Sequence, residues 1–170
     1  MHTIAPAIRR HSPLLWQYRL HTHLFDNVIE DITPHDATRR VTPDTNHIAW
    51  LAGSLVSCRF DMANALGIPQ KAAYVDVYGN HRPIDDSLEY PSLLSLQDDW
   101  HYISPMLLDT LSAIPAVELA NRPSPFEEMH ENTLAEAFSF IIDREAYVIG
   151  QIGILRRILG YSAMKYPDYF

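Results

Sequence analysis

Residues 133–160, TLAEAFSFIIDREAYVIGQIGILRRILG, decide the fold class. Apolar residues recur in this segment at intervals of three and four, which is the spacing of one face of an α-helix. Asn132 or Thr133 offers an N-cap, and two arginines followed by Gly160 provide the positive charge and the left-handed stop typical of a helix C-terminus. The segment therefore predicts a long amphipathic helix.

Three earlier segments have the same helical period. They are residues 13–31, most of residues 41–67 and residues 92–114. We expect the N-cap of the second segment at Asp44, Thr45 or Asn46, because these side chains accept hydrogen bonds from the first free backbone N–H groups. In the third segment Pro105 lacks a backbone N–H, which predicts a bend near Ser104.

The connections after the second and third helices are long and contain many helix-breaking residues. Residues 68–91 include YGNHRP and DDS and are predicted to be a long surface loop. Residues 115–132 contain three prolines and are predicted to be a loop with at most one short turn. Nothing in the sequence indicates a strand pair or an internal repeat. The sequence predicts a single all-α domain over residues 1–170, an antiparallel four-helix bundle with long loops between helices 2–3 and 3–4.

Composition and charge exclude several classes of partner. The formal net charge is −8, from 13 Lys and Arg against 21 Asp and Glu, and a negative surface repels nucleic acid. No apolar run is long enough for a membrane span. The start, MHTIAPAIRR, lacks a secretory signal and Cys58 is the single cysteine, so the expected location is cytoplasmic. We expect Cys58 to be a small core residue rather than a reactive thiol.

Two segments carry a family resemblance: residues 46–60, NHIAWLAGSLVSCRF, and residues 143–160, DREAYVIGQIGILRRILG. Together they resemble the DinB-like (DinB/YfiT) superfamily. The resemblance implies an up-and-down helical bundle with a divalent metal, held by one histidine of the second helix and an H-x-x-x-H pair of the last helix.

The resemblance places the three metal-ligand positions on Ser54, Arg144 and Val148, while the end of the second motif is retained as Gly150, Gln151 and Ile152. A serine hydroxyl is a poor ligand, arginine stays protonated and valine has no lone pair. The metal site is therefore degenerate, and no cofactor is predicted.

A divalent metal such as Zn or Ni would bind only if other ligands rescued this site. The candidates for such a rescue are His47, His21, His23, His101, His130 and Glu145. No two histidines occur on one helix four residues apart, the spacing that places both on one face.

Asp143, Arg144 and Glu145 interrupt an apolar helix, so at least one charge is expected to face inward. For Arg144 there are two alternatives: an ordinary ion pair with Glu30 or Asp26, or a guanidinium that occupies the former metal volume.

The candidate pocket is therefore lined by Ser54, Arg144, Val148 and Gln151, with His47 and His21 nearby either as core residues or as pocket residues. The Gln151 amide is expected to bond across the bundle, and Tyr147 and Trp50 are expected to pack.

Three interpretations of function follow. The first is a DinB-like protein, either non-catalytic or of cryptic function, that binds an unknown small molecule, an anion among the candidates, in this pocket. The second is a metal-dependent thiol transferase or isomerase, a class that the resemblance implies and the missing ligands oppose. The third is an interaction module that forms a homodimer through an apolar helix face.

Overall fold

The structure is a computed structural model that describes residues 13–70, 74–79, 82–124, 126 and 133–166. Within these residues the chain forms seven α-helices and no β-strand, so the all-α expectation is confirmed. The helices are α1 (Pro13–Ile29), α2 (Pro34–Ala37), α3 (Ile48–Ala65), α4 (Val75–Tyr78), α5 (Leu93–Ala113), α6 (Ala116–Asn121) and α7 (Leu134–Ile158).

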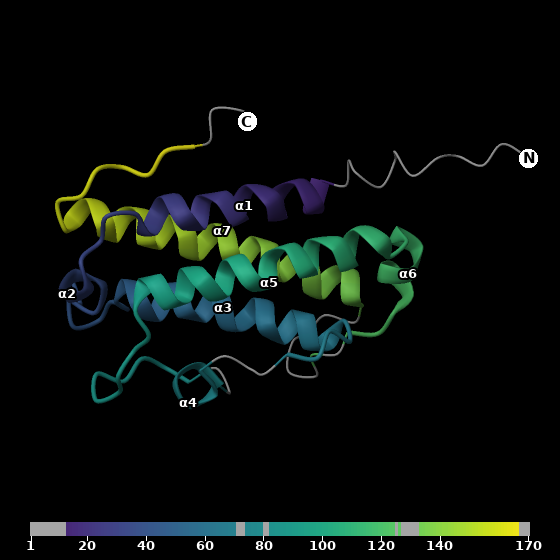
Figure 1. The fold of residues 1–170 in the computed structure, drawn as a ribbon, viewed down its shortest axis with the longest axis horizontal. Coiled ribbons are helices and arrows are strands. Elements are labelled where there is room, and N and C mark those ends of the chain that lie inside the picture. Colours follow the sequence, from purple (N-terminus) through teal and green to yellow (C-terminus); the bar gives the residue numbers. More distant parts are fainter. Residues whose placement is uncertain (1–12, 71–73, 80–81, 125, 127–132, 167–170) are drawn as a thin grey trace, which may run out of the picture.

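The four long helices lie side by side, with α1 and α3 each packed against both α5 and α7 (Figure 1). Tyr18, near the start of α1, bonds to Ser104 in the second half of α5, and Asp26, near the end of α1, bonds to Gln97 near the start of α5. These contacts show that α1 and α5 are antiparallel. Figure 1 shows that α7 runs in the direction of α1, whereas α3 and α5 both run the opposite way.

The expectation of antiparallel packing throughout is therefore wrong for two neighbouring pairs. Pairs α1/α5 and α3/α7 are antiparallel, whereas α1/α7 and α3/α5 are parallel. The reason is that the start of α5 lies beside the start of α3, so the two ends of the connection between these helices are separated by the roughly 27 Å length of α3. Helix periodicity does not encode this reversal, because it depends on the path of the loop.

Two helix starts show how local chemistry sets the ends of the helices. Thr133 caps α7 in a capping box with Glu136, as the sequence predicts, whereas Asn132 lies outside the described residues. The start predicted for α3 is wrong: its cap is His47, not Asp44, Thr45 or Asn46. The His47 ring accepts a hydrogen bond from the Trp50 backbone N–H at 3.0 Å and so replaces the usual capping oxygen.

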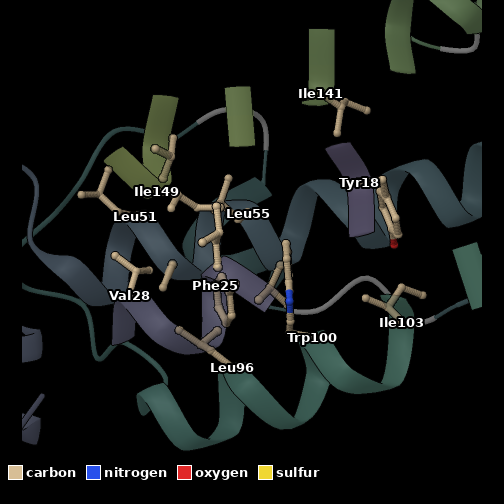
Figure 2. Close-up of a cluster of buried hydrophobic side chains, with 14 of the residues drawn as sticks. Tyr18, Phe25, Val28, Leu51, Leu55, Leu96, Trp100, Ile103, Ile141 and Ile149 are labelled. Atoms are coloured by element: carbon tan, nitrogen blue, oxygen red, sulfur yellow. The ribbon is translucent and has the colours of Figure 1, made fainter. Parts of the chain in front are cut away.

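The core is continuous along the four long helices. Phe25 stacks on Trp100 with ring centroids 4.2 Å apart, and aliphatic side chains of α3, α5 and α7 surround this pair (Figure 2). Outside the four long helices, the Tyr78 hydroxyl of α4 donates to the Ala49 carbonyl at 3.0 Å. This contact requires glycine at position 53, because a Cβ there would lie 1.9 Å from the Tyr78 hydroxyl oxygen.

Candidate functional site

A buried ion pair joins α3 to α7 in the core between the four long helices. Arg59 donates from Nε to Glu145 Oε1 at 2.7 Å and from Nη2 to Oε2 at 3.0 Å. The side chains are 0% and 1% exposed. His21 of α1 lies against the same carboxylate, with Nδ1 3.3 Å from Oε2. This two-bond geometry is the favourable one for an arginine and a carboxylate.

The rest of the Arg59 guanidinium is also enclosed. Its Cζ lies 4.0 Å from the ring centroid of Tyr18 and 3.4 Å from that of Trp100, so the cation is held between two aromatic rings. Nη1 donates to the hydroxyl oxygens of Thr22 and Ser104. Each hydroxyl in turn donates to a backbone carbonyl of its own helix, so the network is satisfied at every group named.

Electrostatics keep Glu145 ionised in this apolar surrounding. Burial by itself raises the pKa of the Glu145 carboxyl, but the charge of Arg59 and the hydrogen bonds from His21 and Arg59 outweigh it and hold the pKa below its ordinary value. A single proton on Glu145 would remove the bidentate pair and leave Arg59 as a buried, uncompensated cation. The network therefore connects α1, α3, α5 and α7 as one charged unit.

The sequence reasoning missed Arg59, and it favoured the wrong member of the charged triplet in α7. The fully buried charge is Glu145, while Asp143 is exposed and Arg144 is half-buried. The sequence does indicate that Arg59 is buried, because Arg59 follows Leu55 by four residues and so lies on the apolar face of its helix. Glu145 occupies a similar position on α7, so each of two neighbouring helices carries one core charge of opposite sign.

The second cluster contains the positions that the resemblance singled out. Arg144 donates from Nη2 to the Ser54 hydroxyl oxygen at 3.2 Å and from Nη1 to the Ser54 carbonyl oxygen at 3.4 Å. The alternative of an ion pair with Glu30 or Asp26 is therefore wrong. Among the residues that the structure describes, no carboxylate forms an ion pair with Arg144.

The other residues of this α3–α7 site flank the Arg144–Ser54 contact. Val148 lies one turn further along α7 and is buried, and Gln151 is half-buried. No hydrogen bond of the Gln151 amide reaches another helix within the described part of the chain. Tyr147, which was expected to pack, is 70% exposed.

The charge of Arg144 also acts on Cys58, which lies one turn after Ser54 on α3. Burial raises the pKa of the Cys58 thiol to about 12, and the Arg144 charge opposes this shift without reversing it. The thiol is therefore protonated at neutral pH and is a weak nucleophile. This agrees with the expectation of a core cysteine.

The two histidines placed beside the pocket lie elsewhere. His47 packs edge-on against Tyr90 with ring centroids 4.5 Å apart, and His21 belongs to the Arg59–Glu145 network. Burial lowers the pKa of His47 to about 4, so its ring is neutral at pH 7 and serves as a helix cap.

The residues considered as substitute metal ligands are dispersed. His101 pairs with Asp26 at 2.9 Å on the α1–α5 side, and His130 lies outside the described residues. Glu145 and His21 are in contact, but Arg59 occupies both carboxylate oxygens. Within the described ranges, no group of three or more His, Cys, Asp or Glu side chains is arranged to hold a metal ion. The side chains present there do not fit the metal that the resemblance implies.

Two hollows open on the α1–α5 side of the molecule. One, of about 360 Å³, lies between the end of α1 and the start of α5. The other, of about 320 Å³, has Tyr18, Thr22 and Ser104 among its lining residues, so it borders the Arg59 network. Neither is lined by Ser54 or Arg144. The α3–α7 site is thus separate from both hollows.

A scan against protein-family models finds no match to this chain, and a search of curated proteins finds no relative. None of the described helices is both long enough and apolar enough to cross a membrane. Interpretation of the chain therefore depends on its own residues.

Proposed function

We propose that this chain is a DinB-like helical-bundle protein in which a cationic binding site has replaced the metal site of the family. In this proposal Arg144 binds the anionic group of a small molecule, and Ser54 holds the guanidinium in place. The role is binding rather than catalysis, and the four long helices form the bundle that carries the site.

One observation carries the proposal: the Arg144–Ser54 contact. The resemblance assigned Ser54 and Arg144 to one ligand set although they are 90 residues apart in the sequence, and the structure brings them within hydrogen-bond distance. Val148, the third assigned position, is one helical turn from Arg144 and buried. Three positions chosen from sequence strings therefore lie around one α3–α7 contact, which supports the relationship.

The charge balance at Arg144 supports an anionic ligand. The partners of Arg144 are two neutral oxygens of Ser54. Most of the five guanidinium N–H donors therefore stay available, and no counter-ion among the described residues balances the charge. A half-buried cation is stabilised when a carboxylate or phosphate accepts two parallel hydrogen bonds from the guanidinium.

Trp50 supplies a second feature that favours a ligand. It lies one turn before Ser54 on the same side of α3, and its buried Nε1 has no hydrogen-bond partner among the described residues. A buried donor without an acceptor costs about 1–3 kcal/mol. An acceptor atom supplied by a ligand bound beside Ser54 would remove this cost.

Thermal unfolding in the presence of anions tests the proposal. With inorganic phosphate at ten times its dissociation constant, the folded state gains about 1.4 kcal/mol. For a chain of this size this corresponds to a rise in Tm of about 3–6 °C. Succinate serves as the carboxylate probe, and sodium chloride keeps the ionic strength constant.

Variants separate specific binding from the general effect of salt. Phosphate stabilises many proteins by exclusion from their surface, and an exclusion effect would be the same in every variant. We expect Arg144→Gln to lose the rise in Tm and Arg39→Gln, whose side chain is 50% exposed and belongs to neither this site nor α7, to keep it. An equal rise in both variants, or no rise with either probe, would contradict the proposal.

A further inference from the structure

Exposed residues form a continuous stripe along the outer face of α7. Its members alternate at intervals of four and three residues, the a/d spacing of a coiled coil. They are Glu136, Phe140, Asp143, Tyr147, Gly150, Ile154 and Arg157, and all seven are exposed. The stripe extends for about 32 Å along the helix.

Three of the seven positions of the stripe carry large apolar side chains although they face away from the core. Phe140, Tyr147 and Ile154 are 43%, 70% and 63% exposed, and they follow one another at intervals of seven residues. Single exposed apolar side chains are common, but three that repeat at heptad spacing on one helix face match the pattern of a coiled-coil interface. Ile158, which is 59% exposed, extends the row at its C-terminal end.

Charge along the stripe indicates the direction of a partner helix. Acidic residues, Glu136 and Asp143, lie in its N-terminal half, and Arg157 lies at its C-terminal end. A parallel copy of α7 would place like charges side by side. An antiparallel copy places the acidic half of each helix beside the basic end of the other, which is favourable in both directions at once.

The shape of the stripe is also complementary to that of a second copy related to it by a two-fold axis. A Cβ added at Gly150 would meet nothing within 4 Å, so the surface is open at this position. In an antiparallel a/d arrangement an a residue lies opposite a d residue of the other helix. The exposed Tyr147 ring would then cover Gly150 of the second copy, and Phe140 would face the second copy's Arg157, a favourable cation–π pair.

We infer that α7 pairs antiparallel with α7 of a second copy of this chain, about a two-fold axis that passes between Tyr147 and Gly150. The second copy is the occupant because the same surface supplies both halves of each contact, as a two-fold interface requires. This inference does not depend on a ligand at Arg144.

Sedimentation equilibrium of the full chain over a range of micromolar concentrations tests this inference. We expect a species of twice the 19.5 kDa chain mass. Tyr147→Glu and Gly150→Leu should each raise the dimer dissociation constant at least about tenfold, because they charge or fill the centre of the interface. Gly150→Leu is the sharper variant, since leucine favours the helix and meets open space within the chain itself.

Two further sets of variants define the orientation and serve as controls. Asp143→Arg and Arg157→Asp should each weaken the dimer, and the double charge exchange should restore it, because opposite charges again lie across the interface. Val117→Glu, a similarly exposed position on α6, should leave the dimer unchanged. A monomer at all concentrations, or a dimer insensitive to Tyr147→Glu and Gly150→Leu, would overturn the inference, whatever happens at Arg144.

Discussion

Removing one partner of the Arg59–Glu145 pair should destabilise the chain far more than removing both. In Arg59→Met the Glu145 carboxylate stays in the core, where its side chain is 1% exposed, with only His21 beside it. Leaving one member of a buried pair without its counter-ion costs about 3–5 kcal/mol. That is a large part of the roughly 5–15 kcal/mol that holds a domain folded.

The double variant Arg59→Met with Glu145→Leu should lose less stability than the two single variants together. Its loss in the free energy of unfolding should be smaller than the sum of the two single losses by at least about 2 kcal/mol, because no buried charge remains. Methionine fits between the rings of Tyr18 and Trp100, where the guanidinium lies. The hydroxyls of Thr22 and Ser104 lose a donor but keep their bonds to backbone carbonyls, so no buried hydroxyl is left unpaired.

Urea unfolding followed by circular dichroism at pH 7 measures these changes, with linear extrapolation for each variant. Arg39→Met is the control, because the Arg39 side chain is 50% exposed in its pair with Asp36 and such pairs contribute at most about 1 kcal/mol. Additive losses from Arg59→Met and Glu145→Leu would refute the reasoning, since they would mean that the two charges do not stabilise each other.

Two more predictions concern α3. Gly53→Ala should lower the free energy of unfolding by about 1–3 kcal/mol in the same urea assay, because the added Cβ would displace the Tyr78 ring. Gly153→Ala on α7 is the control: its Cβ would meet only ordinary contacts, so it should be neutral or stabilising by up to about 1 kcal/mol. Lowering the pH from 6.5 to 5 should cost up to about 2 kcal/mol through His47, because burial lowers its folded-state pKa to about 4 and the unfolded chain alone takes up the proton in this range. His47→Asn, which keeps a cap for the Trp50 N–H, should remove this contribution; parallel pH profiles for both proteins would show that His47 is not its source.

The sequence contained enough information to place the long helices. Their apolar periods and the Thr133 cap predicted the elements to within a few residues, because burial of one helix face is a local pattern. The start of α3 was misplaced because histidine is not a usual N-cap, and its capping role depends on the buried position of its ring beside Tyr90. The parallel pairs were missed because loop paths leave no periodic signal.

The candidate site was predictable only in part. Ser54 and Arg144 were chosen from family-like strings, and their contact is local to one α3–α7 crossing. His47 was included because it precedes Leu51 and Ser54 at helical spacing, and His21 because it lies on the apolar stripe of the first helix. In the structure these two side chains contact Tyr90 and Glu145 instead. Such rotations follow from packing of the whole core, which residue spacing alone does not specify.

The most direct test of the central claim is the NMR signal of the Arg144 side chain during titration with phosphate. The Nε–Hε resonance of Arg144, assigned with Arg144→Gln, should shift and saturate as the anion binds. The resonance of the exposed Arg157 should move little. A saturable shift confined to Arg144 is the result that we predict. An Arg144 resonance that stays in place, or one that moves linearly in step with that of Arg157, would contradict the proposal that Arg144 forms an anion-binding site.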